Sequence, residues 1–441
     1  MFSIHNEHLR GILRDDYTLA EIRGLSALLH EQGTFEFPAL PNGVVPAASL
    51  GGEPYDYTGY SNVWVRDNIH IAHAHFVLGR PDVAVKTLQA LMTYFRKHAG
   101  RFASIIDGTA DHFNVMNRPH IRFNGHELSE IDQQWAHAQN DALGYFLWLY
   151  CKLAIEGHLC PEQDELAALS ALTQFFETVQ YWEDEDSGHW EENRKISASS
   201  IGVATAGLQM LRRFAAGESQ SALDNGDLAP LTLTRLDRLI EQGQSALREI
   251  LPAECVQAGP NYRRYDAALL FLIYPMQAVD AEMEDRILAD VIENLQGQYG
   301  IRRYLGDSYW CADYKTALPP DERTADFSGD MASRDRLLKP GQEAQWCIFD
   351  PIISVIYGLK FQAAGLAEHR RMQTYYLNRS LGQLTGSGGE FPPYRCPESY
   401  YCESGRYVPN DVTPLLWTQA NLALALRGME TTLLSSFHAP A

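Results

Sequence analysis

The stretch WAHAQNDALGYFLWLYCKLAI, from Trp135 to Ile155, indicates the kind of fold to expect. Its apolar residues recur every three and four positions, which is the spacing of one face of an α-helix. Eleven other stretches repeat this spacing, so we expect about twelve helices. The other stretches are Leu19–Leu29, Ile69–Leu78, Val83–Phe95, Leu166–Val179, Ile201–Phe214, Leu231–Ile250, Ala267–Ile273, Ile287–Leu295, Cys347–Phe361, Leu366–Leu381 and Leu415–Leu426.

The segments between these helices are long and rich in Gly, Pro and aromatic residues. Alternating runs of Val, Ile and Thr are nearly absent, so we predict little sheet. Loops of such length inside a compact domain are usually functional. Twelve helices with their long loops gathered at one end predict an all-α fold, a double-ring α/α toroid. The expected loops are 36–63, 100–133, 182–196, 299–341 and 386–413.

The sequence contains no signal of a domain boundary. A length of 441 residues would allow about three domains. No charge run, low-complexity linker or shift in composition divides the sequence, however. We therefore expect one domain over residues 1–441, in which residues 1–35 form an N-terminal extension or helix packed on the barrel.

Composition and charge exclude several classes of partner. Hydrophobic residues make up 45% and charged residues 21% of the chain, which is an ordinary globular balance. The formal charge of −20 argues against nucleic acid and against an anionic membrane surface. A neutral substrate such as a sugar is compatible with it. We find no signal peptide and no apolar run long enough to span a membrane, so we expect a cytoplasmic protein.

Cysteines and histidines give weaker signals. The seven cysteines form no Cys-x-x-Cys pair, and we expect reduced thiols, although Cys396 and Cys402 could pair. His70, His73 and His75 lie close together on one expected helix. No carboxylate follows them at metal-binding spacing, so we interpret them as packing or hydrogen-bonding residues and expect no metal.

The segment Ser61–Asp67 precedes an expected helix and combines Trp64, Arg66 and Asp67. An indole offers a stacking face for a sugar ring, while the guanidinium and the carboxylate could together hold neighbouring hydroxyls. The alternative is an ion pair at a helix start beside a buried tryptophan.

Two further loops carry carboxylates next to aromatic residues. Glu191 and Glu192 follow Trp190, and Glu398 stands before a pair of tyrosines. Burial and a neighbouring negative charge raise the pKa of a carboxyl group, as a general acid requires. Glu191 and Glu398 could form the acid and base of a glycosidase if the fold brings their loops together. The alternative for the first pair is an exposed acidic loop.

A fourth segment, Ile301–Trp310, places Arg303 and Tyr304 in an aromatic block. Arginine and aromatic residues suit sugar binding, but a pair of surface arginines is an equally good interpretation.

In this order the four segments resemble the glucoamylase family of glycoside hydrolases, family 15, and the glucoamylase-like domain of phosphorylase kinase regulatory subunits. The resemblance runs from about Tyr60 to Arg427. It rests on Trp64–Asp67, Trp190–Glu192 with Ser199 and Ser200, Arg303–Tyr309, and Glu398 with Gly405. Supporting blocks are Gln139–Gly144, Tyr265–Leu270 and Pro414–Ala420.

The resemblance implies an (α/α)6 barrel and an inverting, exo-acting hydrolase that releases β-D-glucose from α-glucosides. Glu191 would be the general acid and Glu398 the general base, about 6.5–9.5 Å apart. Arg66 and Asp67 would hold the terminal sugar with help from Arg303. The remaining family positions, which would contact sugar, are Trp64, Trp190, Glu192 and Tyr304. Neither a metal nor a cofactor is required.

Departures from the family pattern leave alternatives open. Ser399 follows the expected base where the family usually has Gln, and 311–340 is longer than in fungal glucoamylases. No starch-binding module is present, so we expect soluble gluco-oligosaccharides or intracellular glucan as substrate. The main alternative is a catalytically weak or silent glucan-binding regulatory protein. Another is a different α/α-toroid enzyme, such as an epimerase or lyase. Linkage preference, the role of 311–340 and assembly into a homo-oligomer stay open.

Overall fold

Six helices with almost wholly buried surfaces form an inner ring in the computed structural model, which describes residues 2–49, 56–217 and 231–436. Each helix packs against the next, and the last returns to the first, so the ring is closed. A helix that is apolar on all sides has to be enclosed in this way. The inner helices are α3 (Val65–Val77), α6 (Asn140–Ile155), α8 (Ala198–Gly217), α11 (Leu270–Ile273), α15 (Phe349–Ala364) and α17 (Leu416–Ser436).

A second set of helices covers the first. Each contacts an inner helix. Although α16 is buried continuously from Tyr376 to Gly382, most bury one stripe, as α10 does through Leu236, Leu239 and Leu247. This pattern is typical of helices with one face in solvent. The outer helices are α2 (Leu19–Glu31), α4 (Pro81–Lys97), α7 (Gln163–Thr178), α10 (Leu233–Ile250), α12 (Ala281–Asn294) and α16 (Ala367–Gly382).

Outer and inner helices alternate strictly along the chain, from α2 to α17, among the described residues. The protein is therefore an (α/α)6 barrel, which confirms the predicted fold class. All twelve predicted helices are present. The loop prediction is wrong in part, because short helices interrupt the expected loop 299–341 and because α5 (Ala99–Ile106) lies in the expected loop 100–133. This helix is too short to show a period of its own, and it buries only Phe102 and Ile105.

Small residues allow the closest contact in the inner ring, between α6 and α8. A Cβ atom at Gly144 would lie 2.7 Å from the backbone of Ala204, and one at Gly207 would lie 2.5 Å from the carbonyl oxygen of Gly144. Only glycine permits this approach without moving a helix backbone.

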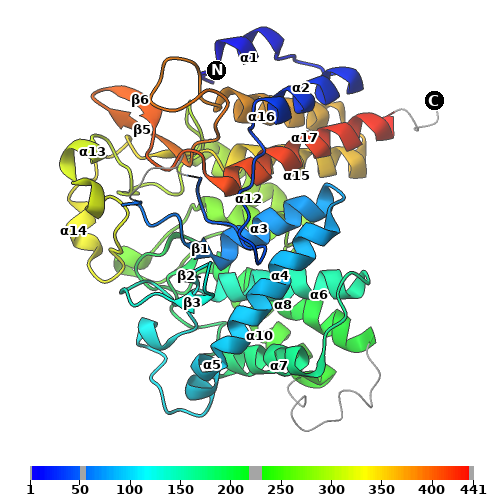
Figure 1. Cartoon of the computed structure of the whole chain (residues 1–441), viewed down its shortest axis with the longest axis vertical. Coiled ribbons are helices and arrows are strands. Elements are labelled where there is room, and N and C mark those ends of the chain that lie inside the picture. Colours follow the sequence, from blue (N-terminus) through cyan, green and yellow to red (C-terminus); the bar gives the residue numbers. More distant parts are fainter. Residues whose placement is uncertain (1, 50–55, 218–230, 437–441) are drawn as a thin grey trace.

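The long loops lie together at one side of the barrel, to the left in Figure 1. They carry two three-stranded antiparallel sheets of very short strands, as the prediction of little sheet requires. One sheet is β1 (Val63–Trp64), β2 (Arg122–Asn124) and β3 (Ser129–Glu130), and the other is β4 (Gln345–Trp346), β5 (Ser399–Glu403) and β6 (Arg406–Pro409). The short helices α13 (Tyr314–Ala317) and α14 (Met331–Asp335) lie in the same region. Residues 50–55 of the expected loop 36–63 lie outside the described residues.

The N-terminal segment supplies the first outer helix of the barrel, α2, and α1 (Glu7–Ile12), which packs on α16. Leu9, Leu25 and Leu29 join a buried cluster with Leu381 of α16 and Leu416 of α17. The N-terminal helices therefore share their apolar contacts with both rings.

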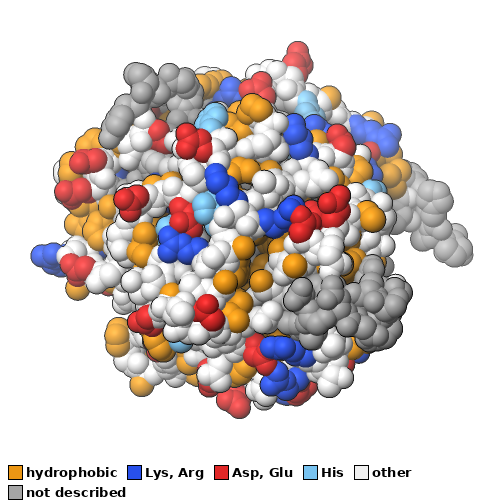
Figure 2. Space-filling model, turned by 60° about the horizontal axis from the view of Figure 1, so that its bottom comes forward, with side chains coloured by type: hydrophobic (Ala, Val, Ile, Leu, Met, Phe, Trp, Pro, Cys, Tyr) orange, Lys and Arg blue, Asp and Glu red, His pale blue; other side chains and the backbone are white. Residues whose placement is uncertain are grey.

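Three further observations concern the surface charges, the lengths of the apolar helices and the cysteines. Acidic and basic side chains are interspersed on the face shown in Figure 2. In the described part of the chain, no helix is both long and apolar enough to cross a membrane. All seven cysteines are free thiols, including Cys396 and Cys402.

Candidate active site

A cavity of about 100 Å³ opens among the loops, and it contains both predicted catalytic carboxylates. Glu191 and Glu398, which are far apart in sequence, both line it, together with Arg66 and Asp67. Aromatic rings make much of its wall and give it faces on which a pyranose can pack. These rings belong to Tyr60, Trp64, Trp135, Tyr309, Trp346 and Trp417.

Glu191 is held by donors from three different segments. Its Oε1 accepts hydrogen bonds from the Trp64 indole (2.8 Å) and from the Gln139 amide (3.0 Å), and its Oε2 accepts one from the Trp135 indole (3.1 Å). Burial raises the pKa of Glu191, while the Arg66 guanidinium, 3.8 Å away, and the Gln139 hydrogen bond lower it. A carboxyl group whose net pKa is raised is suited to donate a proton.

The backbone at Glu191 is unusual for a residue with a side chain. It follows the 3-10 turn Gly188–Trp190 and has a φ of 58°, in the left-handed region. Such conformations cost about 1–3 kcal/mol and persist where the surroundings enforce them. Here the indole and amide donors fix the carboxylate at the cavity wall.

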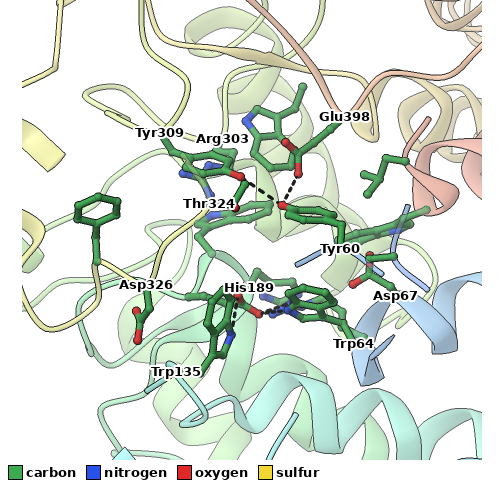
Figure 3. Close-up of a pocket in the computed structure, with 18 of the residues that line it drawn as sticks. Tyr60, Trp64, Asp67, Trp135, His189, Arg303, Tyr309, Thr324, Asp326 and Glu398 are labelled. Carbon is green, nitrogen blue, oxygen red and sulfur yellow. Dashed lines mark hydrogen bonds and ion pairs between the residues drawn. The ribbon is translucent and has the colours of Figure 1, made fainter. Parts of the chain in front are cut away.

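Glu398 stands immediately before β5 and is 2% exposed. Its Oε1 accepts a hydrogen bond from the Tyr60 hydroxyl (2.8 Å), and its Oε2 accepts one from the Asn410 amide. Figure 3 shows that the Tyr60 hydroxyl contacts both Glu398 and Tyr309. The hydroxyl oxygens of Tyr60 and Tyr309 are 3.2 Å apart. Burial raises the pKa of Glu398 to about 7, against the lowering effect of these two hydrogen bonds. This carboxyl group can therefore gain or lose a proton near neutrality.

Arg66 and Asp67, in the first turn of α3, differ in their partners. The Arg66 guanidinium donates to Asp141 (2.8 Å) and to Gln139 (2.7 Å), which fixes its plane. The Asp67 carboxyl makes no hydrogen bond to another side chain among the described residues, and burial raises its pKa to about 7. Because it lines the cavity, Asp67 is free to meet a ligand hydroxyl.

Arg303 and Trp190 also line the cavity, on the side of the aromatic block. Arg303 donates to Asp307 at 2.6 and 2.7 Å, and its guanidinium lies 4.9 Å from the centroid of the Trp346 ring. The Trp190 indole donates to Asp266 (2.9 Å), so its ring plane is fixed. Both side chains are rigid before any ligand arrives.

Glu192 and Tyr304 do not line this cavity. The Glu192 carboxylate accepts from the Tyr304 hydroxyl (2.7 Å), from Arg303 (3.0 Å) and from Arg334 (2.6 Å). Arg263 also lies close to this carboxylate. Together the three arginines hold the pKa of Glu192 well below its usual range, although burial alone would raise it. Glu192 and Tyr304 therefore form a wall beside the cavity, and their contact with sugar stays a prediction.

Several residues of the site were not predicted from the sequence. Tyr60 and Trp135 contact the two carboxylates from remote parts of the sequence, whereas Asn410 follows its partner Glu398 by 12 residues. The long segment 311–340 supplies Thr324–Phe327 to the cavity wall, and Arg334 to Glu192. Most of these residues lie in the expected long loops, which was their only sequence signal. Trp135 instead begins the stretch that we expected to be helical, whereas α6 starts at Asn140.

The histidines of α3 lie among aromatic side chains. Within the described ranges, no group of three or more His, Cys, Asp or Glu side chains is arranged to hold a metal ion. His70 stacks on Trp417 with ring centroids 4.5 Å apart, and His73 lies 4.9 Å from Trp148. These histidines pack against aromatic rings, as we interpreted them.

The sequence between residues 28 and 389 matches the profile of glycosyl hydrolases family 15, which is most of the chain. This chain belongs to glycosyl hydrolase family 15. Solved structures agree in fold with this assignment. A glycosidase variant in complex with glucose superposes with a TM-score of 0.63 at 17% identity, covering 94% of this chain and 98% of that one. A bacterial glucoamylase complexed with acarbose gives 0.57 at 16% identity, covering 90% and 55%.

Curated relatives of this family 15 chain include regulatory subunits of phosphorylase b kinase. The "probable phosphorylase b kinase regulatory subunit alpha" of Caenorhabditis elegans is 25% identical over 424 residues, which covers 85% of this chain. The chain spans only 31% of that relative's length. Both parts of the resemblance noted in the sequence are thereby confirmed.

Proposed function

We propose that this chain is an inverting, exo-acting α-glucoside hydrolase that releases β-D-glucose from non-reducing ends of soluble α-gluco-oligosaccharides or intracellular glucan. The supporting observation is that Glu191 and Glu398 line one cavity with different partners. The proposal treats residues 1–441 as one catalytic domain with 1–35 packed on the barrel, and it keeps a cytoplasmic location as a prediction.

In the proposed mechanism Glu191 is the general acid. Its proton passes to the glycosidic oxygen as the bond to the anomeric carbon breaks. The Trp64 and Trp135 indoles, which donate to Glu191, stabilise the carboxylate that results. Donors fixed before the reaction need no reorganisation as the charge develops.

Glu398 is the general base for the attacking water. It accepts a proton from a water molecule that adds to the anomeric carbon on the face opposite the leaving group, so the configuration inverts. The Tyr60 hydroxyl and the Asn410 amide orient its two oxygens. Of the solved structures that share this fold, a glycosidase variant is in complex with glucose and a bacterial glucoamylase is in complex with acarbose, which supports a glucoside as substrate.

The remaining cavity residues would bind the terminal sugar. Asp67 has a carboxyl group without a side-chain partner, and Arg66 presents its guanidinium edge next to Glu191. Trp190 and Arg303 are held by Asp266 and Asp307, so they would give a rigid wall. Such preorganisation limits the entropy lost when a sugar binds.

A second function is favoured by one observation: curated relatives of this chain are named phosphorylase b kinase regulatory subunits. The alternative is therefore a catalytically weak or silent glucan-binding protein. The two functions differ in whether the paired carboxylates turn over substrate.

The test uses purified protein with maltose, isomaltose, trehalose and maltoheptaose, and it measures released glucose. We expect release from at least one substrate. We also expect a loss of at least about 10²-fold in Glu191→Gln and Glu398→Gln, because each removes a proton-transfer group. Absence of release, together with glucan binding that Trp64→Ala weakens, would establish the regulatory alternative instead.

A further inference from the structure

A second cavity, of about 340 Å³, lies on the other side of the wall formed by Glu192 and Tyr304. Its lining includes Lys195, the loop 260–265 and Met331 of α14. Arg303 lines the catalytic cavity and contacts Glu192, so this wall separates the two spaces. Nothing in the proposed hydrolysis uses the second cavity.

Lys195 is the feature of this cavity that most needs explanation. Its side chain is 4% exposed, yet its ammonium has no hydrogen-bond or ion-pair partner within 4.0 Å among the described residues. Buried ammonium groups are normally paired, because an isolated charge is costly to remove from water. Burial and the nearby Arg263 lower the pKa of Lys195, against the opposing effect of the Glu192, Glu254 and Asp266 carboxylates. A bound anion would remove this penalty.

Arg263 is a second cation with incomplete pairing. Its guanidinium donates to Asp266 at 3.2 Å and to Glu192 at 3.4 Å. Both distances exceed the roughly 2.7–2.9 Å of a strong charge-assisted bond. The guanidinium lies flat over the Tyr304 ring, 3.3 Å from its centroid, which keeps it at the cavity wall. Arg264 also lines the cavity and pairs with Asp290 at 2.9 Å.

The acidic groups that line this cavity have partners of their own. Glu192 is bound by Arg303, Arg334 and Tyr304, as described above. The Asp335 carboxylate accepts the Ser308 hydroxyl at 2.6 Å. Lys195 is thus the charged lining residue without a direct partner in the described part of the chain, although the carboxylates of Glu192, Glu254 and Asp266 act on it, and an anion bound in the cavity would supply such a partner.

The rim of the cavity is suited to the rest of a small ligand. Tyr262 is 57% exposed there, although large apolar rings usually seek burial. An exposed phenol ring can pack against the apolar face of a sugar. Asn193 and Asn261 contribute amides that can bind hydroxyls.

We infer that this cavity binds a phosphorylated monosaccharide, with Lys195 and Arg263 on the phosphate and Tyr262 against the sugar ring. The binding would be reversible, with no covalent step. Its site is distinct from the catalytic cavity, so it does not depend on hydrolytic activity.

Calorimetric titration at pH 7 tests the inference, with glucose 6-phosphate, inorganic phosphate and glucose as probes. Saturating glucose is included in a repeat titration to occupy the catalytic cavity. We expect glucose 6-phosphate to bind once per chain, more tightly than inorganic phosphate, whether or not glucose is present. We expect Lys195→Met to weaken this binding at least tenfold. The matched control is Lys97→Met, which removes an exposed lysine of α4 and should change nothing.

A second variant, Arg264→Gln, keeps the test decisive if Lys195→Met does not fold, as judged by its thermal midpoint. It should weaken binding at least threefold, since its guanidinium lies at the rim. The inference is contradicted if glucose 6-phosphate does not bind or if glucose displaces it. It is equally contradicted if inorganic phosphate binds as tightly, or if both cavity variants bind like the control.

Discussion

Two buried carboxylates in one cavity behave differently because different groups surround them. Glu191 accepts from indole and amide donors and lies near the Arg66 guanidinium, whereas Glu398 accepts from Tyr60 and Asn410. The pKa of both is raised by burial. Their proposed roles require opposite states, since Glu191 must carry a proton when Glu398 does not.

The pH dependence of kcat/KM follows from this requirement. Glu398 has to be ionised, and its pKa is about 7, so activity should fall as the pH falls through about 7. Glu191 has to be protonated, so activity should also fall at higher pH, where this group ionises. We expect a bell-shaped profile in initial-rate measurements on the best substrate. A profile that rises steadily toward acid pH would contradict the role of Glu398.

Tyr60→Phe provides a sharper test of the same carboxylate. The Tyr60 hydroxyl donates to Glu398 and stabilises its charged form, so its loss should raise the pKa of Glu398. The acidic limb of the profile should then move to higher pH, by about one unit for one hydrogen bond to a charged group. A lower rate with an unmoved limb would show that Tyr60 serves packing only.

Among the individual residues of the candidate site, some were predicted from the sequence and others were missed. Glu191, Glu398, Arg66, Asp67, Trp64, Trp190 and Arg303 were named from short motifs, and all line one cavity. Tyr60 was not, because a hydrogen bond between residues 338 positions apart leaves no local spacing. Asn410 follows Glu398 by only 12 residues, but the β5–β6 hairpin that brings it back to this carboxylate was not predicted. Glu192 stands next to Glu191 in the chain, but the turn at Glu191 directs the two carboxylates to different partners.

Among the elements, α14 shows how the long segment 311–340 is attached. Arg334 donates to Glu192 (2.6 Å) and to the Ser308 hydroxyl (2.9 Å), and both acceptors belong to other loops. These buried contacts hold α14 beside the catalytic cavity. The sequence showed that this segment was long, but its periodicity could not show where a five-residue helix would dock.

Arg334→Met should destabilise the protein by about 3 kcal/mol, because it removes one partner of a buried charge. Urea unfolding measures the effect. The matched control is Arg336→Met, an exposed arginine next to the same helix, which should change stability by less than about 0.5 kcal/mol. Equal effects of the two variants would show that the Glu192 contact does not anchor α14.

The contact between α6 and α8 gives a second prediction for the elements. Gly207→Ala would place a Cβ atom 2.5 Å from the Gly144 carbonyl oxygen, so the helices have to move apart. We expect a loss of about 1–3 kcal/mol by denaturant unfolding. Gly24→Ala in exposed α2 meets no atom within 4 Å and should be neutral or stabilising, because alanine favours helix. The proposed packing would be refuted if both changes were tolerated equally.

Helical periodicity predicted the elements well for a physical reason. Inner helices are buried on almost all sides and outer helices mainly on one, and the apolar residues of both repeat at helical spacing. The same method missed α5, whose eight residues bury only two side chains. Short elements depend on tertiary contacts, which a local pattern does not contain.

For the whole molecule, the closed double ring distributes apolar contacts over the length of the chain. Leu29 of α2 packs in the same cluster as Leu416 of α17, so residues near both ends share one core. This is the basis for treating residues 1–35 as part of the same domain as the barrel. Ring closure follows from the alternation of helices, but the partners across the ring could not be deduced from spacing alone.

Leu29→Ala tests whether the N-terminal segment unfolds together with the barrel. Leu29 is fully buried, so its truncation should cost about 3 kcal/mol. Circular dichroism and tryptophan fluorescence should report the same lowered midpoint. The control is Leu359→Ala, a leucine 40% exposed on α15, which should cost far less. A separate early transition in the circular dichroism would mean that α2 forms an independent unit.

The central claim is that Glu191 and Glu398 together hydrolyse an α-glucoside with inversion. The most direct measurement follows the anomer of newly released glucose by proton NMR, in the first minutes of reaction and before mutarotation. The account predicts β-glucose from the wild type, and no detectable release on that timescale from Glu191→Gln or Glu398→Gln. Release of α-glucose, or release that survives either substitution, would contradict it.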